Sequence, residues 1–244
     1  MAPALCEEMR KAQIAIMLLL LAFSVFGFGY VEGLYLKFAP QRAKIVERTP
    51  FFVLALQHLA IALVPTALAL AVALLTGCAL HLAANDELKS LFISASSLGE
   101  TFPSVAIIAL SVPLLGYGNL PCMLALFIYA LLPVLRNTIT GLSQVQKGVT
   151  EAAKGMGMND LQRLLKIELP LAAPIIAAGL KVALIINISA ATLGASVGAG
   201  GLGVTIISGI RTYDTLLVIK GTLPVLLMAL IADALLAPVS RKLD

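Results

Sequence analysis

Long apolar runs separated by short polar stretches dominate the chain. A hydrocarbon core about 30 Å thick requires roughly 20 apolar residues in a helix. Six runs come near that length: residues 14–30, 52–80, 88–115, 122–135, 171–193 and 216–239. The fourth is the shortest, although it can extend to Ile139. The pattern predicts an all-α membrane protein with about six transmembrane helices.

The first run follows Arg10 and Lys11, as the apolar part of a signal peptide would. No clear cleavage site made of small residues, with a soluble domain after it, follows the run. We therefore expect a retained helix. Ten basic residues then lie in the segments expected to be cytoplasmic if both termini are inside, and this bias favours that orientation.

Composition agrees with a membrane protein and excludes several classes of function. Hydrophobic residues make up 60% of the chain and charged residues 12%, against about 45–50% and about 25% in soluble domains. The net charge of +4 comes from scattered basic residues, so nucleic-acid binding has no support.

Candidate chemistry is sparse. Three cysteines, at positions 6, 78 and 122, form no metal or disulfide pattern, and His58 and His81 lack partners at ligand spacing. No phosphate-binding G-x-x-x-x-G-K-[ST] motif occurs. We expect no metal, no cofactor and no enzymatic activity, and any ATP must be bound by another chain.

The polar stretch between the fourth and fifth runs reads EAAKGMGMNDLQRLLKIELP over residues 151–170. Thr150 is a plausible N-cap with Glu151 in the first turn of a helix. Gly157 permits a turn with positive φ. Asn159 or Asp160 can cap a second short helix, in which one apolar face is expected from leucines at positions 161, 164, 165 and 169. The prediction is a small helical hairpin, and an amphipathic interfacial hairpin without a partner is the plainer alternative.

The spacing of this stretch resembles the EAA loop of ABC importer permeases. Glu151-Ala152-Ala153 is followed after three residues by Gly157, and after nine more by Ile167-x-Leu169-Pro170. The resemblance implies a cytoplasmic coupling loop, about residues 148–169, which docks in a groove of a separate ATPase. It implies docking contacts from Glu151, Ala152, Ala153, Gly157, Met158, Leu161 and Arg163.

Further motifs resemble the osmoprotectant branch of these permeases, which serves glycine betaine, choline and related solutes. They are GETFPS at 99–104, YxxLPxxRNT at 129–138, Asn187-Ile188 and GAGGLG at 198–203. Glu100 departs from the branch, where glutamine is usual. The solute therefore stays open between an osmoprotectant and another small solute, either amino-acid-like or a betaine such as ergothioneine.

The glycine-rich segment at 198–203 also matches a dinucleotide-binding pattern, but it lies between two predicted spans rather than in a βαβ unit. It can pack closely against a neighbour and act as a gate, or it can be a flexible connector. The residues expected to line a transport path or its gate are Glu100, Thr101, Pro103, Lys181, Asn187, Gly200 and Gly201.

Glu100 and Lys181 lie at similar expected depths, near the middle of the membrane. A charge at that depth usually finds a partner or faces a water-filled interior. The two side chains are therefore candidates for one another. They could line the path, or they could form a structural ion pair that fixes helix packing.

The resemblance implies one transmembrane permease domain over residues 1–244, with the core at about 52–239. Five helices form a methionine-importer-type core and one N-terminal helix is added. The implied partners are a cytoplasmic ATPase dimer, a second or related permease and a periplasmic solute-binding protein, all at the bacterial inner membrane and its lipid bilayer. Solute choice would lie mainly with the binding protein, since the chain has no Trp for an aromatic cage. The rival interpretation is a secondary transporter that needs no ATPase.

Overall fold

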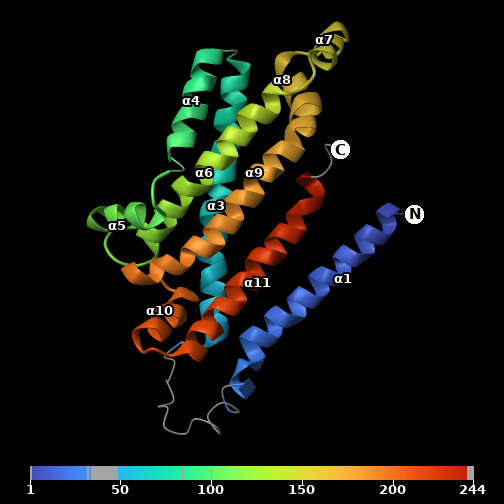
Figure 1. The fold of residues 1–244 in the computed structure, drawn as a ribbon. Coiled ribbons are helices and arrows are strands. Elements are labelled where there is room, and N and C mark those ends of the chain that lie inside the picture. The colour runs from blue at the N-terminus through green and yellow to red at the C-terminus, as the bar shows by residue number, and fades with distance from the viewer. Residues whose placement is uncertain (1, 32, 34–48, 84, 100, 241–244) are drawn as a thin grey trace.

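The computed structural model describes residues 2–31, 33, 49–83, 85–99 and 101–240. Over those residues every regular element is a helix, as predicted (Figure 1). The elements in chain order are α1 (Ala2–Ala22), η1 (Phe23–Gly27), α3 (Phe51–Leu82), α4 (Asp86–Gly99), α5 (Ser104–Leu115), α6 (Asn119–Ser143), α7 (Lys147–Gly155), α8 (Asp160–Arg163), η2 (Leu164–Glu168), α9 (Leu169–Ala190), η3 (Ala191–Val197), α10 (Gly203–Arg211) and α11 (Thr215–Ser240).

Five of the expected membrane passes are single continuous helices. Helices long and apolar enough to cross a bilayer occupy Glu8–Val31, Phe51–Leu82, Asn119–Ser143, Asp160–Val197 and Thr215–Ala237. The fourth predicted run is not short, because α6 starts before Cys122 and has 25 residues. Helix α10 lies in a stretch where only a connection was expected.

The third predicted run is not one helix, which corrects the expectation of a continuous span over 88–115. Helix α4 ends at Gly99 and α5 begins at Ser104, with Pro103 at its N-cap. Proline has no backbone N–H and disfavours helical geometry in the residue before it, which is Phe102. In Figure 1, α4 runs beside the upper part of α3, and α5 lies at the left edge of the bundle, at a steep angle to α4.

Helices α3, α6 and α9 form the centre of the bundle, and polar side chains link them. Asn187 on α9 donates from Nδ2 to Thr66 Oγ1 on α3 (2.8 Å) and to the Leu126 carbonyl on α6 (3.1 Å). His58 Nε2 lies 2.9 Å from the Ile188 carbonyl. Both His58 and Asn187 are fully buried, which agrees with the interpretation of His58 as a packed histidine.

Small residues allow these helices to approach closely. A Cβ at Gly77 would lie 2.5 Å from Thr138 Cγ2, and a Cβ at Gly179 would lie 2.7 Å from Asn137 Cβ. Membrane helices commonly use small residues in this way, because their association depends on close packing. The crossings of α3 and α9 with α6 therefore depend on glycine.

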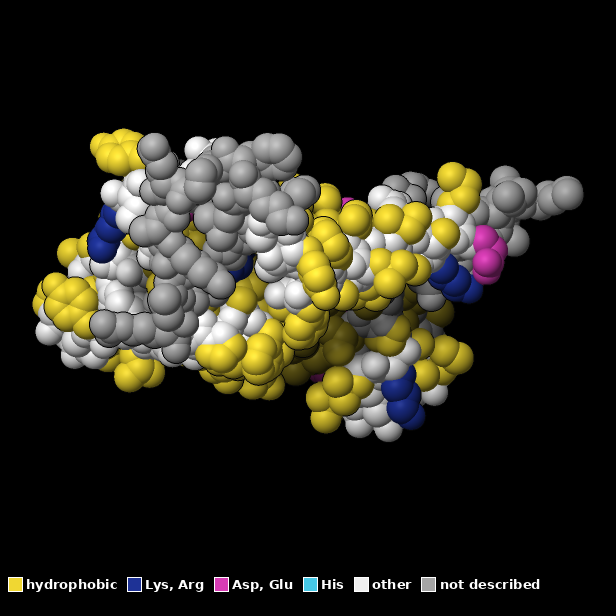
Figure 2. All heavy atoms as spheres, turned by 90° about the horizontal axis from the view of Figure 1, so that it is seen from below, with side chains coloured by type: hydrophobic (Ala, Val, Ile, Leu, Met, Phe, Trp, Pro, Cys, Tyr) yellow, Lys and Arg dark blue, Asp and Glu magenta, His cyan; other side chains and the backbone are white. Residues whose placement is uncertain are grey.

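Apolar side chains cover much of the outer surface. Leu19, Phe26, Leu56, Leu68 and Leu75 are all exposed. Figure 2 shows that hydrophobic side chains dominate the face seen from the α10 end and that charged ones are few. Such a surface suits contact with lipid.

Helix α1 packs against α11, and its N-terminus lies toward the same end of the molecule as the end of α11 and helix α7 (Figure 1). This arrangement agrees with the predicted orientation, in which both ends of the chain lie on the side of the hairpin. The remaining passes pack together as the predicted core.

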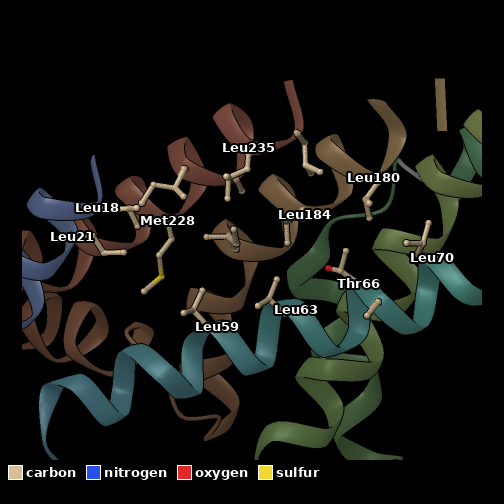
Figure 3. Close-up of a pocket in the computed structure, with 15 residues that line it drawn as sticks. Leu18, Leu21, Leu59, Leu63, Thr66, Leu70, Leu180, Leu184, Met228 and Leu235 are labelled. Carbon is tan, nitrogen blue, oxygen red and sulfur yellow. The ribbon is translucent and has the colours of Figure 1, made fainter. Parts of the chain in front are cut away.

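An apolar hollow of about 530 Å³ lies between α1, α3, α9 and α11 (Figure 3). Leucines such as Leu18, Leu63 and Leu184 point into it from three of these helices. Thr66 is the one polar side chain among the described residues that line it, and its hydroxyl already donates to the Ala62 carbonyl at 2.7 Å. A polar solute would lose its hydrogen bonds to water here and gain few in return, so this hollow is not a suitable transport path.

Candidate coupling site and transport path

Helices α7 and α8 form the predicted hairpin, but α7 starts earlier than predicted. Its N-cap is Gln146 rather than Thr150. The Thr150 hydroxyl instead donates to the Lys147 carbonyl at 2.8 Å. Glu151 therefore lies outside the first turn, and its predicted place there is wrong. Glu151 and Ala152 are exposed, whereas Ala153 is buried.

Gly157 makes the turn, as predicted. Its φ is +79°. The Met158 N–H donates to the Ala153 carbonyl (3.2 Å), and the Gly157 N–H donates to the Lys154 carbonyl (2.9 Å). These two bonds around a left-handed residue form a Schellman motif, which satisfies carbonyls at the end of a helix. The tip of the hairpin is therefore fixed by backbone geometry.

Asn159 caps the second helix, as one of the two predicted alternatives. Its Oδ1 accepts from the Gln162 N–H at 2.8 Å, and Gln162 Oε1 accepts from the Asn159 N–H at 3.1 Å. This reciprocal capping box satisfies two N–H groups that a helix start otherwise leaves unpaired.

The expected single apolar face of this helix is wrong. Leu164 is buried, but Leu161 is 57% exposed and Leu165 is 54% exposed. The prediction assumed 3.6 residues per turn, whereas Leu164–Glu168 forms a π-helical turn in which the Leu169 N–H donates to the Leu164 carbonyl. Pro170 has no N–H for a regular helical bond and crowds the preceding turn. The wider turn accommodates it without ending the helix.

Glu168 ties the hairpin to the transmembrane bundle. Only 2% of its side chain is exposed. Its Oε1 accepts from Arg163 Nε at 2.8 Å, and its Oε2 lies 2.9 Å from His81 Nε2 near the end of α3. Arg163 also donates from Nη1 to Asp160 Oδ1 at 2.7 Å. Arg163, predicted as a docking residue, thus joins α8 to α3 through Glu168.

The residues predicted to line a path lie in different settings. Thr101 and Pro103 are exposed in the connection between α4 and α5. Asn187 is enclosed by the three central helices. Glu100 lies outside the described residues, so its pairing with Lys181 remains a prediction.

Lys181 has an ion pair with a residue that the sequence did not single out. Its Nζ lies 2.8 Å from Asp233 Oδ1 on α11. The Lys181 side chain is 27% exposed and that of Asp233 is 48% exposed. This pair joins α9 to α11 within two membrane-spanning helices.

The glycine-rich segment packs closely against α3 and α6, so it is not a loose connector. The Gly200 N–H donates to Asn119 Oδ1 (2.9 Å), and the Gly201 N–H donates to Gln57 Oε1 (3.3 Å). Gly201 has φ +89°, and a Cβ there would lie 3.1 Å from the His58 Cα. The role of these glycines as a gate remains a prediction.

Sequence reasoning missed Glu168, the partner role of His81, and Asp233. Each had a local signal, because an ionisable side chain within or beside an apolar run usually needs a partner. The partner itself gave no signal, since His81 and Glu168 are 87 residues apart.

Comparison with known proteins agrees with this geometry. Residues 69–244 match the family described as "Binding-protein-dependent transport system inner membrane component". The carnitine transport permease protein OpuCB of Listeria monocytogenes is 40% identical over 187 residues, which cover 77% of this chain and 85% of the relative. The choline transport system permease protein OpuBB of Bacillus subtilis (strain 168) has the same identity and coverage.

A further relative covers more of the chain, and a solved structure shares the fold. The osmoprotectant import permease protein OsmY of Salmonella typhimurium is 35% identical over 229 residues, 94% of this chain and 92% of the relative. An inward-facing structure of the MetNI methionine ABC transporter covers 76% of this chain and 94% of that chain, at 23% identity and a TM-score of 0.65. The chain therefore belongs to the family of inner membrane components of binding-protein-dependent transport systems, as an ABC importer permease.

Proposed function

We propose that this permease imports small osmoprotectants that carry a quaternary ammonium group: glycine betaine, carnitine or choline. The observation that carries the proposal is the 40% identity, over most of both chains, to permeases named for carnitine and for choline. A third relative of the same identity is named for glycine betaine, carnitine and choline together.

We infer that the α7–α8 hairpin docks on a separate ATPase. Leu161 on α8 is 57% exposed, and Leu165 just after it is 54% exposed. Exposed apolar side chains on a polar element are typical of a protein interface. Glu151 and Ala152 are exposed beside them. The contacts of Glu168 with Arg163 and with His81 would then transmit a movement of the hairpin directly to α3.

The proposed assembly has two permease subunits, two ATPase subunits and a periplasmic solute-binding protein. The binding protein supplies solute selectivity, and the permeases supply a path that opens alternately to each side. Exposed charges on α9 and α11 support an arrangement in which that face meets the path or the other permease, because lipid contact would be costly there.

Solute uptake tests the proposal. The chain is expressed with its ATPase and binding protein in a strain that lacks its own osmoprotectant importers. Radiolabelled glycine betaine, carnitine, choline and methionine are then supplied at high osmolarity. Uptake of at least one quaternary ammonium solute, with none of methionine, is the expected result. Uptake of methionine alone, or uptake that persists without the ATPase, would refute the proposal.

A further inference from the structure

The ion pair between Lys181 and Asp233 lies at membrane depth. Lys181 is 12 residues beyond the start of α9, roughly 18 Å along the helix. Asp233 is 7 residues before the end of α11, roughly 10 Å along that helix. Both positions fall within helices that can cross a bilayer. A charged group there avoids hydrocarbon and faces a protein interior or water.

Asp233 is turned away from most of the apolar hollow, whereas Lys181 lies at its edge, because Leu184 and Ile188 on the same side of α9 line the hollow. Asp233 is two residues from Leu235, which lines the hollow, and two residues in a helix are about 160° apart around its axis. Asp233 shares its face with Leu226 and Leu230, which are also exposed. With 48% of the Asp233 side chain and 27% of the Lys181 side chain exposed, neither charge is enclosed by the helices of this chain.

We propose that Lys181 and Asp233 form a binding station for zwitterionic solutes on the transport path. The solute carboxylate would contact Lys181 Nζ, and its quaternary ammonium group would contact the Asp233 carboxylate. This inference rests on the proposed function, and it names the class of solute that this permease favours. Glycine betaine and carnitine carry both charges, whereas choline carries only the ammonium group.

The site selects zwitterions because the bound solute must replace the contact between Lys181 and Asp233. A solute that enters between Lys181 and Asp233 must separate charges that lie 2.8 Å apart. A zwitterion replaces each partner with a new one. A cation alone leaves the lysine without its counter-charge, and an uncompensated charge in a poorly solvated site is costly. The pair therefore admits the zwitterion more readily and releases it when the pair forms again.

Uptake of two solutes by matched variants tests the station. Lys181→Met leaves Asp233 free to attract a cation, so glycine betaine uptake should fall about tenfold relative to choline uptake, the loss expected for one charge-assisted contact. Lys181→Arg keeps the charge and should retain most of the wild-type ratio. The double variant Lys181→Met/Asp233→Leu removes both charges, and its glycine betaine uptake should stay low.

A purely structural ion pair gives a different pattern. Lys181→Met would then lower both uptakes by the same factor, and the double variant would restore them, because no charge is left unpaired. Either result would contradict the proposal that Lys181 and Asp233 bind the solute. A weaker association of permease subunits with an unchanged solute ratio also overturns it, in favour of a subunit contact. If the wild-type importer takes up neither solute, the proposed function is contradicted. If it takes up both solutes and no variant changes the ratio of glycine betaine uptake to choline uptake, only this inference is contradicted.

Discussion

Gly157 turns the chain between α7 and α8 with φ +79°. We predict that Gly157→Val abolishes coupled uptake while the protein still inserts in the membrane. A β-branched side chain has a steric cost in this conformation of about 1–2 kcal/mol, although a Cβ at this position would meet no other atom within 4 Å. The hairpin tip would relax into another geometry and move its exposed side chains.

Gly155 provides the matched control. It is the last residue of α7, it has no positive φ, and a Cβ there also meets nothing within 4 Å. Gly155→Ala should therefore leave uptake and solute-stimulated ATP hydrolysis close to wild type. If Gly155→Ala and Gly157→Val reduced uptake equally, the positive-φ turn at Gly157 would not be what coupled uptake requires.

Local signals at single residues were predictable, and distant partners were not. The turn at Gly157 and the cap at Asn159 follow from the backbone preferences of those residues and their near neighbours. The start of α7 was misplaced because a threonine resembles an N-cap wherever it precedes a helical pattern, and its hydroxyl can equally bond back to a carbonyl within the helix. The ion pair of Lys181 with Asp233 needed knowledge of how α9 and α11 lie together.

At the scale of elements, the Glu168 network joins the hairpin to α3. We predict that Glu168→Gln lowers the stability of the hairpin and the coupling of ATP hydrolysis to uptake. Loss of one member of a buried ion pair costs about 3–5 kcal/mol, and the partial exposure of Arg163 and His81 places this case near the lower value. Hydrogen exchange of residues 147–168, measured beside uptake, checks both effects.

Asp160→Asn is the control for that prediction. It removes the other carboxylate that contacts Arg163, but the Asp160 side chain is 75% exposed. Surface ion pairs contribute about 0–1 kcal/mol, so hydrogen exchange and uptake should barely change. If Asp160→Asn is as damaging as Glu168→Gln, the link from Glu168 to His81 has no special part in coupling.

Apolar runs predicted the long helices well, because a membrane span is defined by length and hydrophobicity. They failed where the backbone departs from a regular helix inside an apolar run. Hydropathy does not register the interruption before Pro103 in the third run. Nor does it register the π turn at Leu164–Glu168.

At the scale of the whole molecule, the hairpin projects from the end of the bundle (Figure 1) and offers exposed leucines to a partner. We predict that Leu161→Glu prevents co-purification of the ATPase without unfolding the permease, since the side chain makes no part of the buried core. Tyr117→Ser is the control, because Tyr117 is exposed in the connection between α5 and α6, away from the hairpin. Co-purification of the ATPase with the Leu161 variant at the wild-type level would place the docking surface elsewhere.

Glycine betaine uptake into proteoliposomes that contain the permease, its ATPase and the binding protein tests most directly whether the hairpin couples transport to ATP. We predict that uptake requires both ATP and the binding protein. Glu151→Lys, which reverses a charge on the exposed hairpin, should abolish uptake while the permease stays folded. Uptake without ATP, or undiminished uptake by the Glu151 variant, would contradict the claim that this chain is a permease driven by an ATPase through its α7–α8 hairpin.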